Sequence, residues 1–341
     1  MKYLFVLLCI GAVYPSFSQG TDSSGYYLHK GNEAKNERRY LVASQLYKKS
    51  IQFKADNADA QRELGNVYME MKKYPEAILA YNEVAKANPN DTTAVTKLAY
   101  LFFWTRKWND AIAFSKRMQA MKIGKDANYM IGKSYFEQED FGQAYTYLQT
   151  AAKEDPSNGE IPYTIGKSFV EMSNYRAAAP FLEKAVQLDS SNGRKIYECA
   201  MNFAAIPNDK DAIRYYLLAA DRGYRTDNDY YENLSISYQA LGQMDKCIDL
   251  LKKVLEKKPA DLELLYSIAD IHYKMGKYNE AIDYWDKILY YDKQNAKALY
   301  MIGMCYQKKG DKAKGIQLCD QAIKMDPSLQ SMKQKKVNIG M

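Results

Sequence analysis

The sequence predicts an all-α fold, a solenoid of about nine helix–turn–helix units that ends in a short capping helix. The main observation is a spacing of large and small side chains that returns about every 34 residues. Hydrophobic and charged residues make up 47% and 26% of the chain, as in ordinary folded proteins. Glycines and prolines also fall at the expected turns: Gly242, Gly276, Gly310, Pro89, Pro156, Pro259 and Pro327.

Each unit should consist of two helices that approach each other closely through small residues. In the copy that starts near residue 58, the small residues are Gly65 and Ala77, and Tyr68 and Tyr81 fill the space around them. The same offsets return in copies that start near residues 92, 125, 159, 228, 262 and 296, and more weakly near residues 24 and 193. Because one helix pair cannot bury its apolar face alone, the copies are expected to stack.

This pattern resembles the tetratricopeptide repeat, a helix–turn–helix unit of 34 residues, over nearly all of the chain after residue 23. The resemblance implies a right-handed superhelix in which the first helix of each unit lines a concave face. Chaperone-binding members of the family hold a terminal carboxylate with lysines and asparagines from three successive repeats. Arg62 and Asn66 begin such a pattern here, but Lys97, Asp126 and Met130 do not continue it, so this role is not expected.

Several departures from the repeat are expected to alter its curvature. Pro180 lies inside a second helix, where it bends the helix or removes a backbone hydrogen bond. The copy from residue 193 has an unusual turn at 206–209 and no proline after its second helix. These departures suggest two sub-arrays, residues 24–191 and 193–329, before a C-terminal cap and tail at 330–341. His272 replaces the usual tyrosine at a packed position, and a core imidazole with one hydrogen bond is favoured over a functional histidine.

Residues 1–18 have the pattern of a signal peptide. Lys2 precedes an apolar run from Tyr3 to Val13, and cleavage is expected after Ser18. The expected location is therefore the periplasm or outside the cell. A lipid anchor on Cys9 is less favoured, because the residues before it suit a lipoprotein processing site poorly. The other cysteines lie at apolar helix positions, where free buried thiols are expected: Cys199, Cys247, Cys305 and Cys319.

The sequence shows none of the usual catalytic constellations of residues. With two histidines in the chain and none of the usual nucleophile, phosphate-binding or zinc motifs, no enzyme activity, cofactor or metal is expected. The net charge of +7 is spread along the chain, so nucleic acid is not an expected partner. No later stretch approaches the roughly 20 apolar residues of a membrane span.

The candidate binding residues come from the phase of the first helices, which line the concave face in the family that the chain resembles. The candidate partner-binding residues are Tyr100, Phe103, Trp104, Tyr129, Lys133, Phe136, Tyr163 and Lys167. Further side chains expected on the same face are Val170, Tyr197, Tyr266, Tyr273, Tyr300 and Met304. Large aromatic side chains are favoured anchors at protein interfaces, and the two lysines offer a place for an acidic group.

The leading hypothesis is a non-enzymatic scaffold of the cell envelope that binds segments of other proteins along an aromatic groove. One alternative is a carbohydrate or cell-wall binder, since aromatic faces also stack on sugar rings. Another is a structural subunit of a secretion or motility complex. A purely structural role for the aromatic rings, which would then fill the interior of the superhelix, also stays open.

Overall fold

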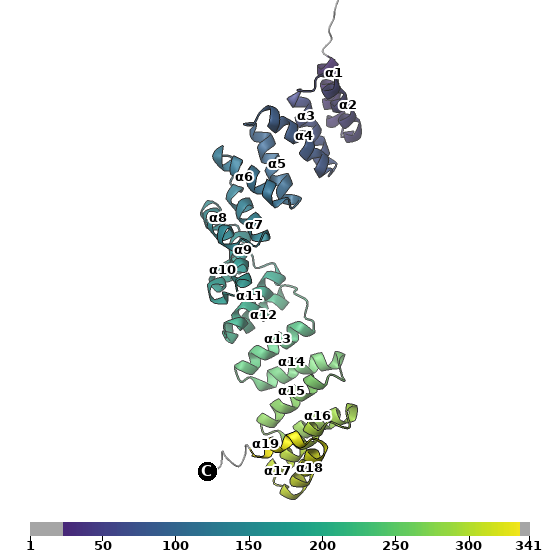
Figure 1. Ribbon diagram of the computed structural model, residues 1–341, viewed down its shortest axis with the longest axis vertical. Helices are drawn as coiled ribbons and strands as arrows, with labels where there is room; N and C mark the ends of the chain where they lie inside the picture. Colours follow the sequence, from purple (N-terminus) through teal and green to yellow (C-terminus); the bar gives the residue numbers. More distant parts are fainter. Residues whose placement is uncertain (1–22, 335–341) are drawn as a thin grey trace, which may run out of the picture. The chain divides into compact units, whose positions relative to one another are not determined.

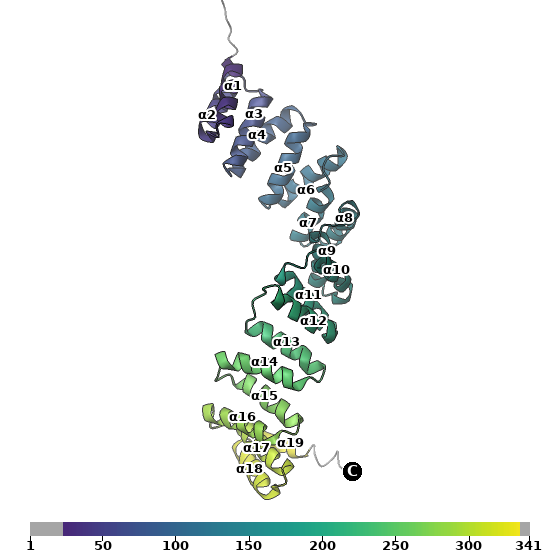
Figure 2. The ribbon, with the colours of Figure 1, turned by 180° about the vertical axis from the view of Figure 1, so that it is seen from behind.

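The computed structural model describes residues 23–334, and every regular element in this range is a helix. Consecutive helices pair into nine hairpins, and within each compact unit each hairpin lies beside the next (Figures 1 and 2). The predicted all-α solenoid of about nine units is therefore confirmed. None of the helices in this range is long and apolar enough to cross a membrane.

The chain divides into two compact units, one up to Asp155 and the other from Pro156. The hairpins of the first unit are α1 (Ser23–Asn36) with α2 (Tyr40–Phe53), α3 (Ala58–Glu70) with α4 (Tyr74–Ala87), α5 (Thr92–Trp104) with α6 (Trp108–Ala120), and α7 (Ala127–Glu137) with α8 (Phe141–Glu154). The hairpins of the second unit are α9 (Glu160–Glu171) with α10 (Tyr175–Leu188), α11 (Gly193–Ala205) with α12 (Asp209–Asp221), α13 (Asn228–Ala240) with α14 (Met244–Lys257), α15 (Leu262–Lys274) with α16 (Tyr278–Tyr291), and α17 (Ala296–Lys308) with α18 (Lys312–Met325).

This division does not coincide with the boundary between residues 191 and 193, which stays a prediction. The proposed signal peptide at 1–18 lies outside the described residues, as does the tail from residue 335 onward.

One residue in the turn of most hairpins adopts a left-handed backbone. The three predicted turn glycines do so, with φ of 70°, 74° and 98° at Gly242, Gly276 and Gly310. Arg106, at the equivalent point between α5 and α6, has a φ of 56° although it is not a glycine. The N–H of Lys107 then donates to the carbonyl oxygen of Phe102 at 2.9 Å, which closes the end of α5.

Small residues let the two helices of a hairpin pack closely, as predicted. A Cβ atom added to Gly166 of α9 would lie 2.7 Å from Leu182 of α10, and one on Gly132 of α7 would lie 2.7 Å from Leu148 of α8. Such distances are shorter than van der Waals contact, so a larger residue at either glycine would push the helices apart.

Pro180 lies exposed within α10, and the helix continues through it from Tyr175 to Leu188. Since proline has no N–H, the carbonyl of Arg176 receives no helical hydrogen bond from it. In the irregular copy that follows, Gly223 has a φ of 79° and the N–H of Tyr224 closes α12 on the carbonyl of Ala219 at 2.9 Å.

The last hairpin is covered by a short cap, as predicted. The 3-10 helix η1 (Pro327–Leu329) follows α18 directly and leads into α19 (Gln330–Gln334). Leu329 is buried and packs with Tyr300 and Met304 of α17 and with Ala322 of α18. The cap thus shields the apolar end of the stack from water.

The predicted burial of the cysteines and of His272 is confirmed. Cys199, Cys247, Cys305 and Cys319 are all buried as thiols outside disulfides. The ring of His272 stacks on Tyr284 with 5.5 Å between centroids. The prediction that this imidazole makes one hydrogen bond was wrong, because neither ring nitrogen has a partner within the described part of the chain.

Candidate protein-binding surfaces

The first candidate surface lies on α5, in the first unit. Leu98, Leu101 and Phe102 face the core and are buried. The helical period then turns Tyr100 and Trp104, which are four residues apart, away from that core. Trp104 is 57% exposed, and its ring centroid lies 5.7 Å from that of Tyr100. These two predicted residues form one aromatic surface, called here the α5 surface.

Phe103 connects α5 to the next hairpin. Its ring centroid lies 6.1 Å from Tyr129 of α7 and 6.0 Å from Trp108 of α6. Both Phe103 and Tyr129 are half-buried, so part of each ring contributes to packing between hairpins. Phe136 packs 5.9 Å from Phe141, at the start of α8. The predicted aromatic residues of the first unit are therefore divided among several local contacts.

The polar groups beside these rings already have partners in the chain. The Tyr100 hydroxyl donates to the Asp126 carboxylate, and burial together with this carboxylate raises the pKa of Tyr100 to about 12. The Lys133 ammonium lies 4.4 Å from the centre of the Phe136 ring and 2.9 Å from a Glu137 oxygen. An acidic group of a partner would have to compete with Glu137 for Lys133.

In the second unit, Tyr163 and Lys167 of α9 converge on one carboxylate of α11. The Tyr163 hydroxyl donates to Glu198 at 2.6 Å, and the Lys167 ammonium lies 3.5 Å from the same Glu198 oxygen. Lys167 also lies 3.8 Å from Glu171, one turn along its own helix. Burial, reinforced by Glu198, holds the pKa of Tyr163 well above its usual range. Lys167, like Lys133, is already paired.

Three residues expected on the concave face are instead buried, and this expectation was wrong for them. Tyr197 is 7% exposed because Tyr224, from the loop after α12, stacks on it with 4.1 Å between centroids. Tyr300 and Met304 are 3% and 8% exposed because Leu329 of the cap packs against them. Other side chains expected on this face are half-buried, namely Val170, Tyr266 and Tyr273.

The two residues that began the carboxylate-binding pattern have structural partners. Arg62 forms ion pairs with Asp59 at 2.7 Å and with Asp91 at 2.8 Å. The oxygen of the Asn66 side chain accepts a hydrogen bond from the Tyr81 hydroxyl at 2.6 Å. Both contacts hold neighbouring helices together, which gives these residues a role without a ligand.

A pocket of about 270 Å³ opens between α9 and α11 in the second unit. Its lining residues are Lys167, Val170, Tyr175, Leu182, Glu198, Met201, Asn202 and Ala205. Lys167 and Val170 were predicted for this face, whereas the residues from α10 and α11 were not. The sequence did contain one signal, since a polar Asn202 occupies a buried helix position that is mostly small or aliphatic in the other copies.

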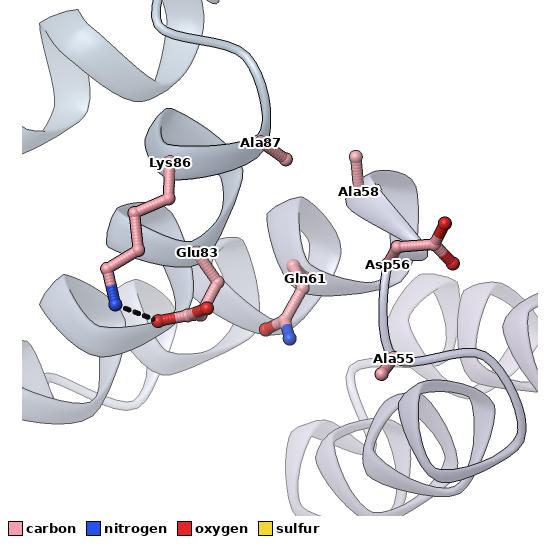
Figure 3. A pocket seen from close by; sticks show the side chains of 7 residues that line it. All are labelled: Ala55, Asp56, Ala58, Gln61, Glu83, Lys86 and Ala87. Atoms are coloured by element: carbon pink, nitrogen blue, oxygen red, sulfur yellow. Dashed lines mark hydrogen bonds and ion pairs between the residues drawn. The ribbon is translucent and has the colours of Figure 1, made fainter.

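Two other hollows are more polar. One of about 390 Å³ lies beside the loop between α2 and α3, where Asp56, Gln61 and the Glu83–Lys86 ion pair line it (Figure 3). The other, about 250 Å³ between α13 and α15, is lined by Glu232, Asp261, Glu263 and the exposed Ile236, among others. Among the described residues, no side chain that lines either hollow has a buried polar atom without a hydrogen-bond partner.

Comparison with known families matches the repeats directly. Models of the tetratricopeptide repeat match residues 36–101, 229–261, 262–295 and 296–329. The chain contains tetratricopeptide repeats. The predicted repeat starts near 228, 262 and 296 agree with these matches to within one residue. A model described as anaphase-promoting complex, cyclosome, subunit 3 matches residues 104–185.

Curated relatives include Hsp70-Hsp90 organizing protein 3 of Arabidopsis thaliana, 26% identical over 135 residues, and Hsp70-Hsp90 organizing protein of Triticum aestivum, 28% identical over 148 residues. Each match covers 39% of this chain, and the chain spans only 23% and 22% of the two relatives. Among solved structures, YrrB, described as a TPR protein with an unusual peptide-binding site, is 21% identical with a TM-score of 0.44, and the match covers 55% of this chain and 97% of that one.

Proposed function

We propose that this chain is a non-enzymatic scaffold of the cell envelope that binds segments of other proteins on the faces formed by its first helices. Tetratricopeptide repeats are protein-interaction modules, which supports the binding role. The exposed Trp104 beside Tyr100 is the observation that carries the proposal. A tryptophan side chain that exposes 57% of its area gains much by being covered, and tryptophan is enriched among the residues that dominate binding energies.

The test is a Trp104→Ala variant, compared with the parent by crosslinking in the native envelope. Because Trp104 is exposed, its removal should change the free energy of unfolding by only about 0.5 kcal/mol. Partner binding should weaken by about 30-fold, the loss typical of a dominant interface tryptophan. Far-ultraviolet circular dichroism checks that the helices stay intact.

Leu79→Ala is the matched control, since Leu79 is 67% exposed but lies on α4, a second helix. It should leave the crosslinked product unchanged. Equal capture by the parent and by Trp104→Ala would remove the α5 surface from the proposal. Phe103 and Phe136 are less suitable for a first test, because both also pack against other rings.

A carbohydrate or cell-wall ligand is the second candidate, favoured by the exposed Trp104 ring beside the half-buried Tyr100 on the α5 surface. Sedimentation with peptidoglycan distinguishes the two functions. If the parent sediments with peptidoglycan and Trp104→Ala does not, the ligand is a carbohydrate. If the parent is crosslinked to a protein and Trp104→Ala is not, the ligand is a protein partner.

The envelope location rests on the signal-peptide pattern of residues 1–18. Mass spectrometry of the chain recovered from an envelope fraction should give a mature N-terminus directly after Ser18. Recovery of the unprocessed chain in the cytoplasmic fraction would contradict this location.

A further inference from the structure

Asn202, which lines the pocket between α9 and α11, carries a buried hydrogen-bond acceptor that the fold does not use. Asn202 is 3% exposed, and its Nδ2 donates to the carbonyl oxygen of Tyr175 at 3.0 Å. Its Oδ1 has no partner among the described residues. Turning the amide over would set two oxygens against each other, so the contact with Tyr175 fixes Oδ1 as the unsatisfied atom.

The repeat gives no structural reason for an asparagine here. The equivalent position in the other copies from the second onward is occupied by buried Val67, Leu101, Ser134, Ser168, Ser237, Ile271 and Cys305. These residues are aliphatic or small, and two of the small ones, Ser134 and Ser237, also carry a buried hydroxyl without a partner among the described residues. Asn202 brings a larger amide to the same place, and only half of it is satisfied within its own chain. Buried amide oxygens are nearly always paired, so an external donor is expected.

The rest of the pocket is suited to one large apolar side chain. Val170, Leu182 and Ala205 give it apolar walls, and its volume of about 270 Å³ lies just below the range of about 300–1,000 Å³ typical of sites for whole small molecules. Lys167 and Glu198, which neutralise each other, lie at the same pocket. The pocket therefore offers an apolar volume and no net charge, and one unsatisfied acceptor lies buried in a residue of its wall.

We propose that this pocket binds a tryptophan side chain of a partner protein, with the indole N–H donating to Oδ1 of Asn202. Tryptophan is the largest apolar side chain, and its one polar group is a donor without acceptor capacity, which matches a lone acceptor. The proposal rests on the proposed binding function and names the side chain that the second unit recognises.

Filling the pocket must move part of its wall. Oδ1 is covered from solvent in the unliganded pocket, so an indole reaches it only after a neighbouring side chain shifts. Met201 lines the same pocket and is 45% exposed. Its unbranched thioether rearranges at low cost, so its methyl group should report binding.

The experiment follows the ¹³C-labelled methionine methyl groups of the full chain by NMR during titration with N-acetyl-tryptophanamide. The Met201 signal, assigned with Met201→Leu, is expected to shift with millimolar affinity. The analogue methylated on the indole nitrogen should bind about 2- to 10-fold more weakly, because it cannot donate the hydrogen bond. A Met201 signal that no aromatic probe shifts, or equal binding of the two indoles, would overturn the proposal.

Two variants separate recognition from folding. Asn202→Ser carries the residue found at this position in three other copies, and should keep the fold while losing the preference between the two indoles. Ala205→Leu keeps the asparagine and fills the pocket, and should abolish the Met201 shift. Tighter binding of N-acetyl-phenylalaninamide or N-acetyl-leucinamide would show that the pocket selects apolar side chains without using the acceptor of Asn202, and would reject tryptophan.

The outcome is independent of the α5 surface in the first unit. If Trp104→Ala abolishes partner capture while no probe shifts Met201, the pocket proposal fails and the proposed function stands. If the indole binds as expected but Trp104→Ala and Leu79→Ala capture partners as well as the parent does, the α5 surface fails and the pocket stands.

Discussion

His272 is an ionisable group placed where its charged form has no support. Its ring is buried against Tyr284, and neither nitrogen has a partner in the described chain. Burial lowers the pKa of His272 below its ordinary value of 6.5. The nearby Lys252 lowers it further, while Glu280 opposes this in part, and Lys277 and Asp245 have smaller effects of opposite sign. The folded second unit therefore holds this imidazole neutral.

This arrangement makes the second unit sensitive to acid. Below pH 6.5 the unfolded chain binds a proton at residue 272 that the folded chain does not, so the free energy of unfolding should fall as the pH drops toward the lowered folded pKa. His272→Phe keeps a ring against Tyr284 and removes the titration. Its melting temperature should change less between pH 7.5 and pH 5 than that of the parent, as measured by circular dichroism. An identical pH dependence in both proteins would contradict this account.

At the scale of single residues, the phase of the repeat was enough to predict that Trp104 is exposed. It was not enough for Tyr197, Tyr300 and Met304, because the groups that cover them lie outside the repeat pattern. Tyr224 comes from an irregular loop, and Leu329 from the cap. The pocket was also missed, since its volume depends on side chains of three helices whose relative positions the spacing does not specify.

Among the elements, the turns within the hairpins offer the clearest test of backbone strain. Arg106 has a left-handed φ of 56°, which costs a residue with a Cβ atom about 1–2 kcal/mol. Glycine removes this cost but loses about 0.5–1 kcal/mol through its greater freedom in the unfolded chain. Arg106→Gly should therefore raise the free energy of unfolding by about 0.5–1 kcal/mol, seen as a higher urea midpoint at unchanged slope.

Gly276→Ala tests the reverse change. No atom lies within 4 Å of a Cβ built on Gly276, whose φ is 74°. The variant should lose about 1 kcal/mol in its free energy of unfolding, and this loss would come from the strained backbone alone, since the added methyl group meets no neighbour. A lower stability of Arg106→Gly, or no loss in Gly276→Ala, would show that the turns are not strained.

The helices themselves were the easiest elements to predict. In several hairpins a glycine of the first helix packs against a leucine or tyrosine of the second, as Gly166 does against Leu182. These contacts require a fixed separation between the two residues along the chain, and the sequence shows that separation in copy after copy. The left-handed turn residues that are not glycines were harder to predict from the sequence. Hydrogen bonds such as that from Lys107 to Phe102 impose the left-handed backbone on any residue at the turn position.

For the whole molecule, the two compact units suggest two independent folding blocks. Residues up to Asp155 contain four hairpins and those from Pro156 contain five, and at least about three repeats are needed for a stable stack. Fragments 23–155 and 156–341 should each be helical and unfold cooperatively with urea. A fragment that is unstructured alone would show that its stability depends on the other unit.

The four cysteines in the described part of the chain bear on how it responds to its redox environment. They are buried as free thiols, and burial raises the pKa of Cys305 to about 12 and that of Cys199 above its usual range. Reagents and oxidants attack the thiolate, which these surroundings suppress. The slow labelling of these thiols by a maleimide would measure how often the three hairpins that contain them open, namely α11 with α12, α13 with α14, and α17 with α18.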